Sequence, residues 1–195
     1  MVLKDRVIGF GFTGAYCVFE QVFPELERLA AEGAAVVPLV SYQAAVTDTR
    51  YGKAAGFLER MERIAGRPPV MTITEAETVN KQGRPLDLLV IAPCTASTLS
   101  KLASGVSDTP VLMMAKEQFR NDRPVVLGIA TNEGLGLSAR NIGVLLSAKN
   151  VFFVPFGQDD PEHKPNSLIA KFESVLPTVL AALQGRQYQP VLEKY

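Results

Sequence analysis

The feature that most constrains the fold of this chain is a series of short apolar segments separated by stretches with helical spacing. Segments that are apolar at nearly every position are typical of strands buried on both faces, as in a parallel sheet. Parallel strands need long crossover connections, which helices usually supply. The sequence predicts strands at Val7–Phe12, Ala34–Val40, Leu86–Ala92, Val125–Ala130 and Asn150–Pro155.

Helical spacing fills most of the intervening chain. It predicts a helix after Gly14 and further helices at Lys53–Ala65, Thr98–Ser104, Val111–Phe119, Ala139–Ala148 and Leu168–Gln184. This alternation favours an α/β fold with a doubly wound parallel sheet, Rossmann-like, in three α/β/α layers. Residues 66–84 are expected to form a short strand or arm, because Pro68-Pro69 interrupts them, and Gly157–Pro165 is expected to be a surface loop.

Length and charge exclude several classes of protein. The chain has 195 residues and is 47% hydrophobic, which fits one domain over 1–195, with a C-terminal helix and tail from about 165. Lys plus Arg number 20 and Asp plus Glu number 20, so no overall field attracts nucleic acid or an anionic membrane. No apolar run reaches the roughly 18 residues of a membrane-spanning helix. We therefore expect a soluble, cytoplasmic protein.

The cysteines and the histidine are too few for a zinc site. Cys17 and Cys94 form no CxxC pair, and His163 is the only histidine. A structural disulfide is not expected in a cytoplasmic α/β fold. We predict no metal, and we interpret His163, in its polar segment, as a solvated loop residue.

The first candidate site follows the first strand. In open parallel sheets, ligands bind outside the carboxyl ends of the strands, where the strand order reverses. Gly11 and Gly14 would let a ligand approach the backbone, Thr13 offers a hydroxyl, and a helix N-terminus follows, which together suit a phosphate. Ser41, after the second strand, suits a phosphate or ribityl group. The alternative for the glycines is an ordinary tight turn between strand and helix.

A second candidate loop follows the third strand. Thr95, Ser97 and Thr98 provide three hydroxyls within four residues, directly before a predicted helix. Such residues also serve as N-caps, so a capping role alone is the alternative. One cap needs a single hydroxyl, and we therefore favour a polar cradle that holds the phosphate from the side opposite the glycine loop.

Two of these segments resemble a known family. GFGFTGAY, then IAPCTASTLSKLASGVSD and PVLMM, are similar to the flavin-binding cysteine decarboxylase superfamily, with its Gly-x-(Thr/Ser)-Gly loop and its Lys-x-Ala-x-Gly-x-x-Asp segment. The resemblance implies a doubly wound fold, oligomeric assembly and bound FMN. It implies that the FMN-binding residues are Gly11, Thr13, Gly14, Ser41, Thr95, Ala96, Ser97 and Thr98.

The chain also departs from the decarboxylase branch of that superfamily. That branch carries a catalytic His soon after the second strand, whereas Ser41–Lys53 contains none. It also has an Asn in a Pro-x-Met-Asn segment, and Pro110–Lys116 has no Asn. An FMN-dependent decarboxylase is therefore the disfavoured alternative.

The downstream half is more particular. PVVLGIATNEGLGLSARNIGVLLSAKNVFFVPFGQDDPEHKPNSLIAKFE and the ending ALQGRQYQPVL resemble the family of dipicolinate synthase B subunits over essentially the full length. This resemblance implies a part in spore formation, with a nicotinamide-binding (NADP or NAD) A subunit as partner. The reaction would oxidise a dihydrodipicolinate-type dicarboxylate to dipicolinic acid. A non-catalytic partner subunit with a vestigial flavin pocket is the remaining alternative.

Three further expectations concern the surroundings of the site. Asn132, at the end of the fourth strand, is a weaker candidate for the flavin ring or the substrate. A dicarboxylate needs one or two cations, and those nearest the predicted strand ends are Arg50, Lys53, Lys116, Arg120, Arg123 and Arg140. We also expect a homo-oligomer built partly on apolar helix faces around Leu99–Val106 and Val111–Met114.

Overall fold

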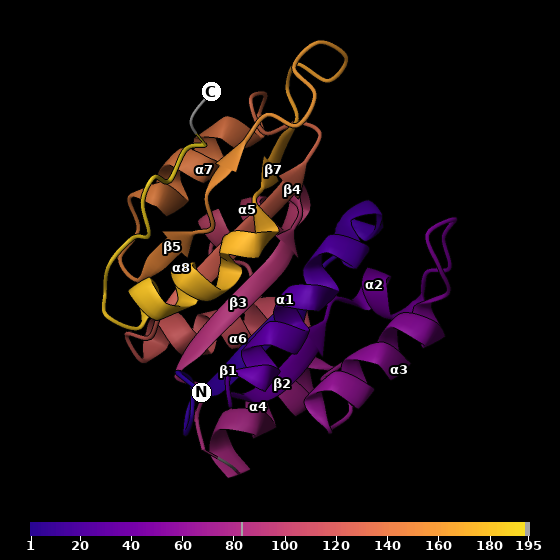
Figure 1. The fold of residues 1–195 in the computed structure, drawn as a ribbon, viewed down its shortest axis with the longest axis vertical. Coiled ribbons are helices and arrows are strands. Elements are labelled where there is room, and N and C mark those ends of the chain that lie inside the picture. Colours follow the sequence, from indigo (N-terminus) through magenta and orange to yellow (C-terminus); the bar gives the residue numbers. More distant parts are fainter. Residues whose placement is uncertain (83, 194–195) are drawn as a thin grey trace.

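The strands form one sheet that is parallel except at one edge. The computed structural model describes residues 1–82 and 84–193 (Figure 1). The parallel part has the order β2-β1-β3-β4, with β5 paired to β4. Its strands are β1 (Val7–Phe12), β2 (Ala35–Val40), β3 (Leu88–Cys94), β4 (Val125–Thr131) and β5 (Val151–Phe153). All five strands predicted from the sequence are present, although β5 is shorter than expected.

Helices cover both faces of this sheet, which confirms the three-layer α/β/α architecture. On one face, α1 contacts both α3 and α8; on the other, α5 contacts α6 and α7, and α4 packs against α6 (Figure 1). The helices are α1 (Phe19–Ala31), α2 (Tyr42–Val46), α3 (Ala54–Ala65), α4 (Ile73–Gln82), α5 (Ala96–Ala103), α6 (Pro110–Arg120), α7 (Ser138–Leu146) and α8 (Val175–Ala182). In the described part of the chain, none of them is long and apolar enough to cross a membrane.

The strand order reverses between β1 and β3. The chain leaves β1 toward β2 on one side and later returns to pair β3 with the other side of β1. The carboxyl ends of β1 and β3 therefore diverge into loops that lead to opposite faces of the sheet. This is the position at which open α/β sheets bind their ligands.

The antiparallel edge was not predicted. A helix was expected from Leu168, but Leu168–Ala170 is strand β7, which pairs antiparallel with Ala130 and Thr131 at the end of β4. β7 also pairs with β6 (Phe156–Gly157), and α8 begins only at Val175, after the short 3-10 helix η2 (Phe172–Ser174). Because β5 is short, it leaves the end of β4 unpaired, and β7 takes that place.

The prediction for residues 66–84 was only partly right. Val70 is extended and forms an isolated parallel bridge with Leu39, beside the β2 edge. Helix α4 then begins at Ile73, where a strand or arm was expected. Its start is capped in the usual way, because Glu75 accepts hydrogen bonds from the amides of Met71 and Thr72.

The apolar helix faces that were expected to form an oligomer interface instead cover the sheet. Leu99, Val111 and Met114 are each 0% exposed. Val106, at 42% exposure, is the one large exposed side chain in those two described segments. Four exposed apolar side chains lie on α7 or on the turn before it: Leu135, Leu137, Val144 and Leu146.

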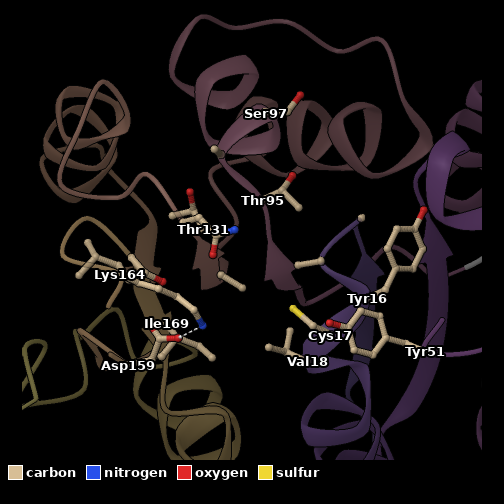
Figure 2. Close-up of a pocket in the computed structure, with 17 residues that line it drawn as sticks. Tyr16, Cys17, Val18, Tyr51, Thr95, Ser97, Thr131, Asp159, Lys164 and Ile169 are labelled. Atoms are coloured by element: carbon tan, nitrogen blue, oxygen red, sulfur yellow. Dashed lines mark ion pairs between the residues drawn. The ribbon is translucent and has the colours of Figure 1, made fainter. Parts of the chain in front are cut away.

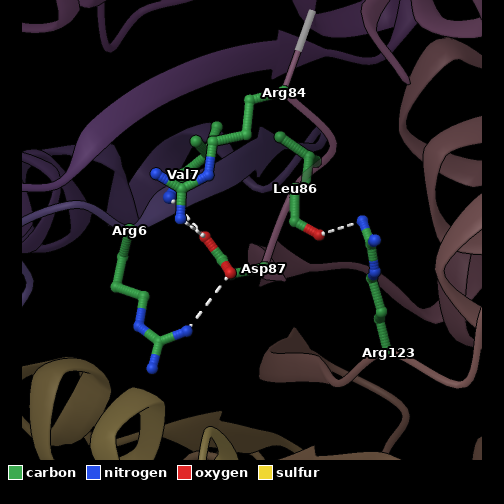
Figure 3. A network of polar contacts seen from close by, with 6 residues as sticks. All are labelled: Arg6, Val7, Arg84, Leu86, Asp87 and Arg123. Atoms are coloured by element: carbon green, nitrogen blue, oxygen red, sulfur yellow. Dashed lines mark hydrogen bonds and ion pairs between the residues drawn. The ribbon is translucent and has the colours of Figure 1, made fainter. Parts of the chain in front are cut away.

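A polar network closes the amino end of the sheet, opposite the reversal point. Asp87 accepts hydrogen bonds from the Val7 amide at 2.8 Å and from Arg6 Nη1 at 3.2 Å, and Arg123 donates to the Leu86 carbonyl at 2.8 Å (Figure 3). Arg123 is therefore far from the ligand-binding edge to which the sequence had assigned it.

Candidate functional site

Two cavities lie side by side at the carboxyl ends of β1, β3 and β4. One, of about 520 Å³, is lined by residues that follow β1, β2 and β3, and we call it the loop cavity. The other, of about 420 Å³, extends toward β4 and β7, and we call it the hairpin cavity. Both are lined by Gly14, Tyr16, Thr95 and Ser97. The two loops singled out from the sequence therefore meet at one place, between the cavities.

Thr13 ties these two loops together. Its hydroxyl donates to the Pro93 carbonyl at 2.6 Å and accepts from the Thr95 amide at 3.2 Å. The side chain is only 2% exposed, so its hydroxyl braces the loops from beneath, between β1 and β3. The bond partners of Thr13 fix the spacing of the groups that face the cavities.

The glycines of the first loop have different roles. A Cβ at Gly11 would lie 2.8 Å from Val111 Cγ1, so Gly11 makes room for helix α6. A Cβ at Gly14 would meet nothing closer than the Tyr16 ring at 3.8 Å, and Gly14 is not among the glycines with positive φ. Gly14 therefore leaves open space toward the cavities, and the fold itself does not require a glycine there.

Helix α5 presents its amino end to the same space. Thr95 is the N-cap and accepts from the Thr98 amide at 3.3 Å, and its hydroxyl lies 3.0 Å from that of Thr98. Thr98 is buried, whereas Ser97 is exposed. The amides of Ala96 and Ser97 belong to the first helical turn, which has no intrahelical acceptor, so they can bind an anion.

Ser41 completes the loop cavity on the β2 side. Its Oγ caps α2 by accepting from the Ala44 amide at 3.4 Å, which leaves its hydroxyl proton for another acceptor. The loop after β1 does not lead directly into the N-terminus of an α-helix, as was expected. The short 3-10 helix η1 (Tyr16–Val18) separates it from α1, which begins at Phe19. Of the two helices that the sequence predicted to bind the anion, α5 is the one whose N-terminus directly follows its loop.

The Lys-x-Ala-x-Gly-x-x-Asp segment also has a structural explanation. Lys101 and Asp108, both at the loop cavity, form an ion pair with 2.7 Å between Nζ and Oδ2. The chain turns between them at Gly105, whose φ of +70° is one that side chains rarely adopt. This pair holds the start of the α5–α6 connection against the cavity.

The hairpin cavity contains residues that sequence reasoning missed. Lys164 and Asp159, from the connection between β6 and β7, face Cys17 and Tyr51 across it (Figure 2). Ser167, from the same connection, also lines this cavity. Thr131 and Asn132 line it at the end of β4, so Asn132 does lie at the site. The missed residues are brought there by the β4–β7 pairing, which no local pattern signals.

Tyr16 stands between the two cavities. Its hydroxyl donates to the Gln43 carbonyl at 2.9 Å, and its ring packs 5.4 Å from that of Phe19. Phe19 belongs to an aromatic cluster with Phe12, Phe23 and Phe57. Tyr16 is thus held at both ends and forms a rigid wall shared by both cavities.

The cations expected from the sequence do not line either cavity. Among the lining residues that the structure describes, the cations are Lys101 and Lys164. Arg50 lies nearby, with its guanidinium 4.9 Å from the centre of the Tyr51 ring. His163 is on the β6–β7 connection with its side chain 80% exposed, 2.9 Å from Asp160, as expected for a loop residue.

Comparison with known proteins gives concordant findings. A family model described as Flavoprotein matches residues 2–177. The B subunit of dipicolinate synthase from Bacillus subtilis is 48% identical over 190 residues, which are 97% of this chain and 94% of that protein.

Solved structures extend this likeness to the whole fold. The B subunit of dipicolinate synthase from Bacillus halodurans has a TM-score of 0.90 at 44% identity, covering 100% of this chain and 99% of that one. DmrB from Burkholderia xenovorans, a cubic protein cage in complex with FMN, has a TM-score of 0.68 at 16% identity, covering 92% and 98%. At that low identity, the likeness to DmrB concerns the fold alone.

Proposed function

Because the chain belongs to the flavoprotein family and, within it, to the dipicolinate synthase B subunits, we propose that it is the B subunit of a dipicolinate synthase. The reaction, carried out during sporulation, would convert a dihydrodipicolinate-type precursor into pyridine-2,6-dicarboxylate. This is a two-electron oxidation that makes the ring aromatic. The proposal rests on the pair of loops braced by Thr13 at the reversal point and on 48% identity over 97% of the chain to the Bacillus subtilis B subunit.

We further propose that the loop cavity holds the phosphate and ribityl groups of FMN. Ser41 and Ser97 line this cavity, and Ala96 lines the adjoining hairpin cavity. The amides of Ala96 and Ser97 and the hydroxyls of Ser41 and Ser97 would bind the phosphate and ribityl oxygens. Gly14 leaves open space between the cavities, which the ribityl chain of FMN would need. The fit rests on this chain's own donors, since Thr13 and Thr98 hold the loops and the other groups remain free to bind.

The flavin ring would then lie toward the hairpin cavity, past Tyr16 and near Asn132. When bound, FMN supplies a two-electron acceptor for the hydride that leaves the dihydro ring. Tyr16, fixed at its ring and its hydroxyl, would limit how the ring and the substrate stack. The nicotinamide cofactor (NADP or NAD) of an A subunit partner is the other acceptor that this reaction admits.

The alternatives make different use of the same cavities. A decarboxylase would need its acid–base residues, and Ser41–Lys53 has no His and Pro110–Lys116 has no Asn. A non-catalytic subunit would keep the fold and position the A subunit without binding flavin. The exposed mouth of the cavities, where Tyr42 and Tyr51 are 44% and 45% exposed, leaves room for a partner in either case.

Reconstitution of the enzyme tests the proposal. Oxidation of the dihydrodipicolinate precursor would be followed with each subunit alone and with both together, in the presence of FMN and the nicotinamide cofactor. We expect activity only when both subunits are present, and loss of activity when this chain carries Gly14→Val. Full activity from the A subunit alone would overturn the catalytic role and leave this chain an accessory.

A further inference from the structure

The hairpin cavity carries one cation in a position suited to a carboxylate. Lys164 points from the β6–β7 connection toward the cavity interior and lies 3.6 Å from Asp159 (Figure 2). We propose that Lys164 binds one carboxylate of the dicarboxylate substrate and so decides substrate specificity, an inference that rests on the proposed function. A lysine ammonium has three donors, and Asp159 can occupy only part of them.

The connection that carries Lys164 is braced by its own backbone. The Lys164 amide donates to the Asp160 carbonyl at 2.7 Å, and the Ser167 amide donates to the Lys164 carbonyl at 2.9 Å. Gln158 Nε2 donates to the Pro165 carbonyl at 2.8 Å, which closes the connection across its base. The ammonium is therefore presented from a preformed turn, which lowers the entropy lost on binding.

The base of the same connection is fixed against β4. The Leu135 amide donates to the Asn166 carbonyl at 3.0 Å, and the Leu168 side chain fills the space over Gly134, where a Cβ would approach it to 2.6 Å. Gly134 thus permits β7 to approach the turn after β4. This packing holds Lys164 at the edge where Asn132 and Thr95 also face the cavity.

Asp159 has hydrogen-bond partners besides Lys164. Burial opposes ionisation of Asp159, but the Ser167 hydroxyl, the Asp159 amide and Lys164 together lower its pKa. At 3.6 Å from Asp159, the Lys164 ammonium keeps donors that can bind a second carboxylate. Asp159 is then a positioning residue, and Lys164 is the group that touches the substrate.

The other cation at the two cavities is less available. Lys101 is held by Asp108 at 2.7 Å, against 3.6 Å for the Lys164 pair. The Lys164 side chain is also the more exposed of the two, at 54% against 36%. Between the two described cations, the geometry therefore favours Lys164 as the one that exchanges its partner for a ligand.

A double-mutant cycle, in which one change is made in the protein and the other in the ligand, tests the role of Lys164 in the FMN-loaded full chain. The dissociation constants of pyridine-2,6-dicarboxylate and pyridine-2-carboxylate would be measured calorimetrically for wild type and Lys164→Gln. Lys171→Gln is the matched control, because Lys171 also pairs with an exposed carboxylate, Glu193, at 3.5 Å but lies outside both cavities. Unfolding midpoints of all three proteins would be compared in parallel.

We expect Lys164→Gln to weaken the dicarboxylate at least tenfold and to affect the monocarboxylate much less, with no change in Lys171→Gln. Lys164→Gln and removal of the second carboxylate from the ligand each lower the affinity. The two losses should not add, because both remove the same contact. Unchanged dicarboxylate affinity in Lys164→Gln would refute the role of Lys164 and leave the proposed function standing. Wild-type protein that binds FMN but no dicarboxylate would refute both the role and the proposed substrate.

Discussion

Thr13 shows how a residue chosen for ligand chemistry can serve first as a brace. The sequence assigns its hydroxyl to a phosphate, whereas the structure places that hydroxyl between Pro93 and Thr95 in a buried position. The near-isosteric Thr13→Val removes both hydrogen bonds and takes this partner from the buried Pro93 carbonyl and the half-buried Thr95 amide. We expect it to lower the free energy of unfolding by about 1–3 kcal/mol.

Urea denaturation measures this cost. Thr13→Ser retains the hydroxyl and should recover most of the lost stability, which separates the hydrogen bonds from the packing of the methyl group. FMN affinity should fall in Thr13→Val and recover in Thr13→Ser, because the spacing of the two loops depends on the bonds. If Thr13→Val were as stable as wild type, the brace would have no energetic role.

At the scale of elements, the contact of α1 with η2 and α8 contains a buried acid. Glu25 on α1 is 6% exposed, and its Oε2 has no hydrogen-bond partner. Burial raises its pKa above the ordinary value of 4.5, although Arg28, 3.7 Å away, opposes that shift. The folded state therefore binds this proton more tightly than the unfolded state does.

The sign of the pH dependence follows from that difference. Glu25 contributes most to stability below pH 4.5, and this contribution is lost as pH rises through the raised pKa of the folded state. Glu25→Gln should remove this loss and stabilise the protein at neutral pH. Denaturation across this pH range provides the check, with exposed Glu59→Gln on α3 as control. A Glu25→Gln profile parallel to that of wild type would contradict the assignment.

Elements could be predicted where the local sequence determines them, and were missed where they depend on contacts with distant residues. The parallel strands were predictable because a strand buried on both faces has apolar residues at nearly every position, as in Leu88–Cys94. Leu168–Ala170 was mistaken for helix, because its strand pairing depends on Ala130 and Thr131, far away in the chain. Helix α4 was missed because Pro68-Pro69 was taken to interrupt the whole segment, although the helix begins soon afterwards at Ile73.

Some residues of the candidate site could likewise be predicted from the sequence, and others could not. The loops around Gly14, Ser41 and Thr95 were found because parallel strands end at one edge, a rule that needs only the strand assignments. Lys164 and Asp159 reach that edge through the antiparallel β7. They lie near Gly14 only because of the tertiary fold. The residues proposed for substrate specificity could therefore not be selected from the sequence.

At the scale of the whole molecule, exposed apolar side chains point to assembly through α7 and the turn before it. Leu135, Leu137, Val144 and Leu146 are 51%, 82%, 51% and 44% exposed. We expect sedimentation to show a homo-oligomer at micromolar concentration and Leu137→Lys to weaken it while the subunit stays folded. A monomeric wild-type protein would contradict this prediction, as would an unaffected assembly in Leu137→Lys.

Flavin titration tests directly whether the paired loops form an FMN site. FMN binding by the purified full chain would be measured by fluorescence quenching for wild type, Ser97→Ala and Gly14→Val. We expect wild type to bind FMN, Ser97→Ala to lose about 1–2 kcal/mol of affinity, and Gly14→Val to lose more. Gly14→Val should unfold at an unchanged midpoint, because its side chain enters open space. A wild-type chain that binds no FMN, or variants with wild-type affinity, would contradict the account.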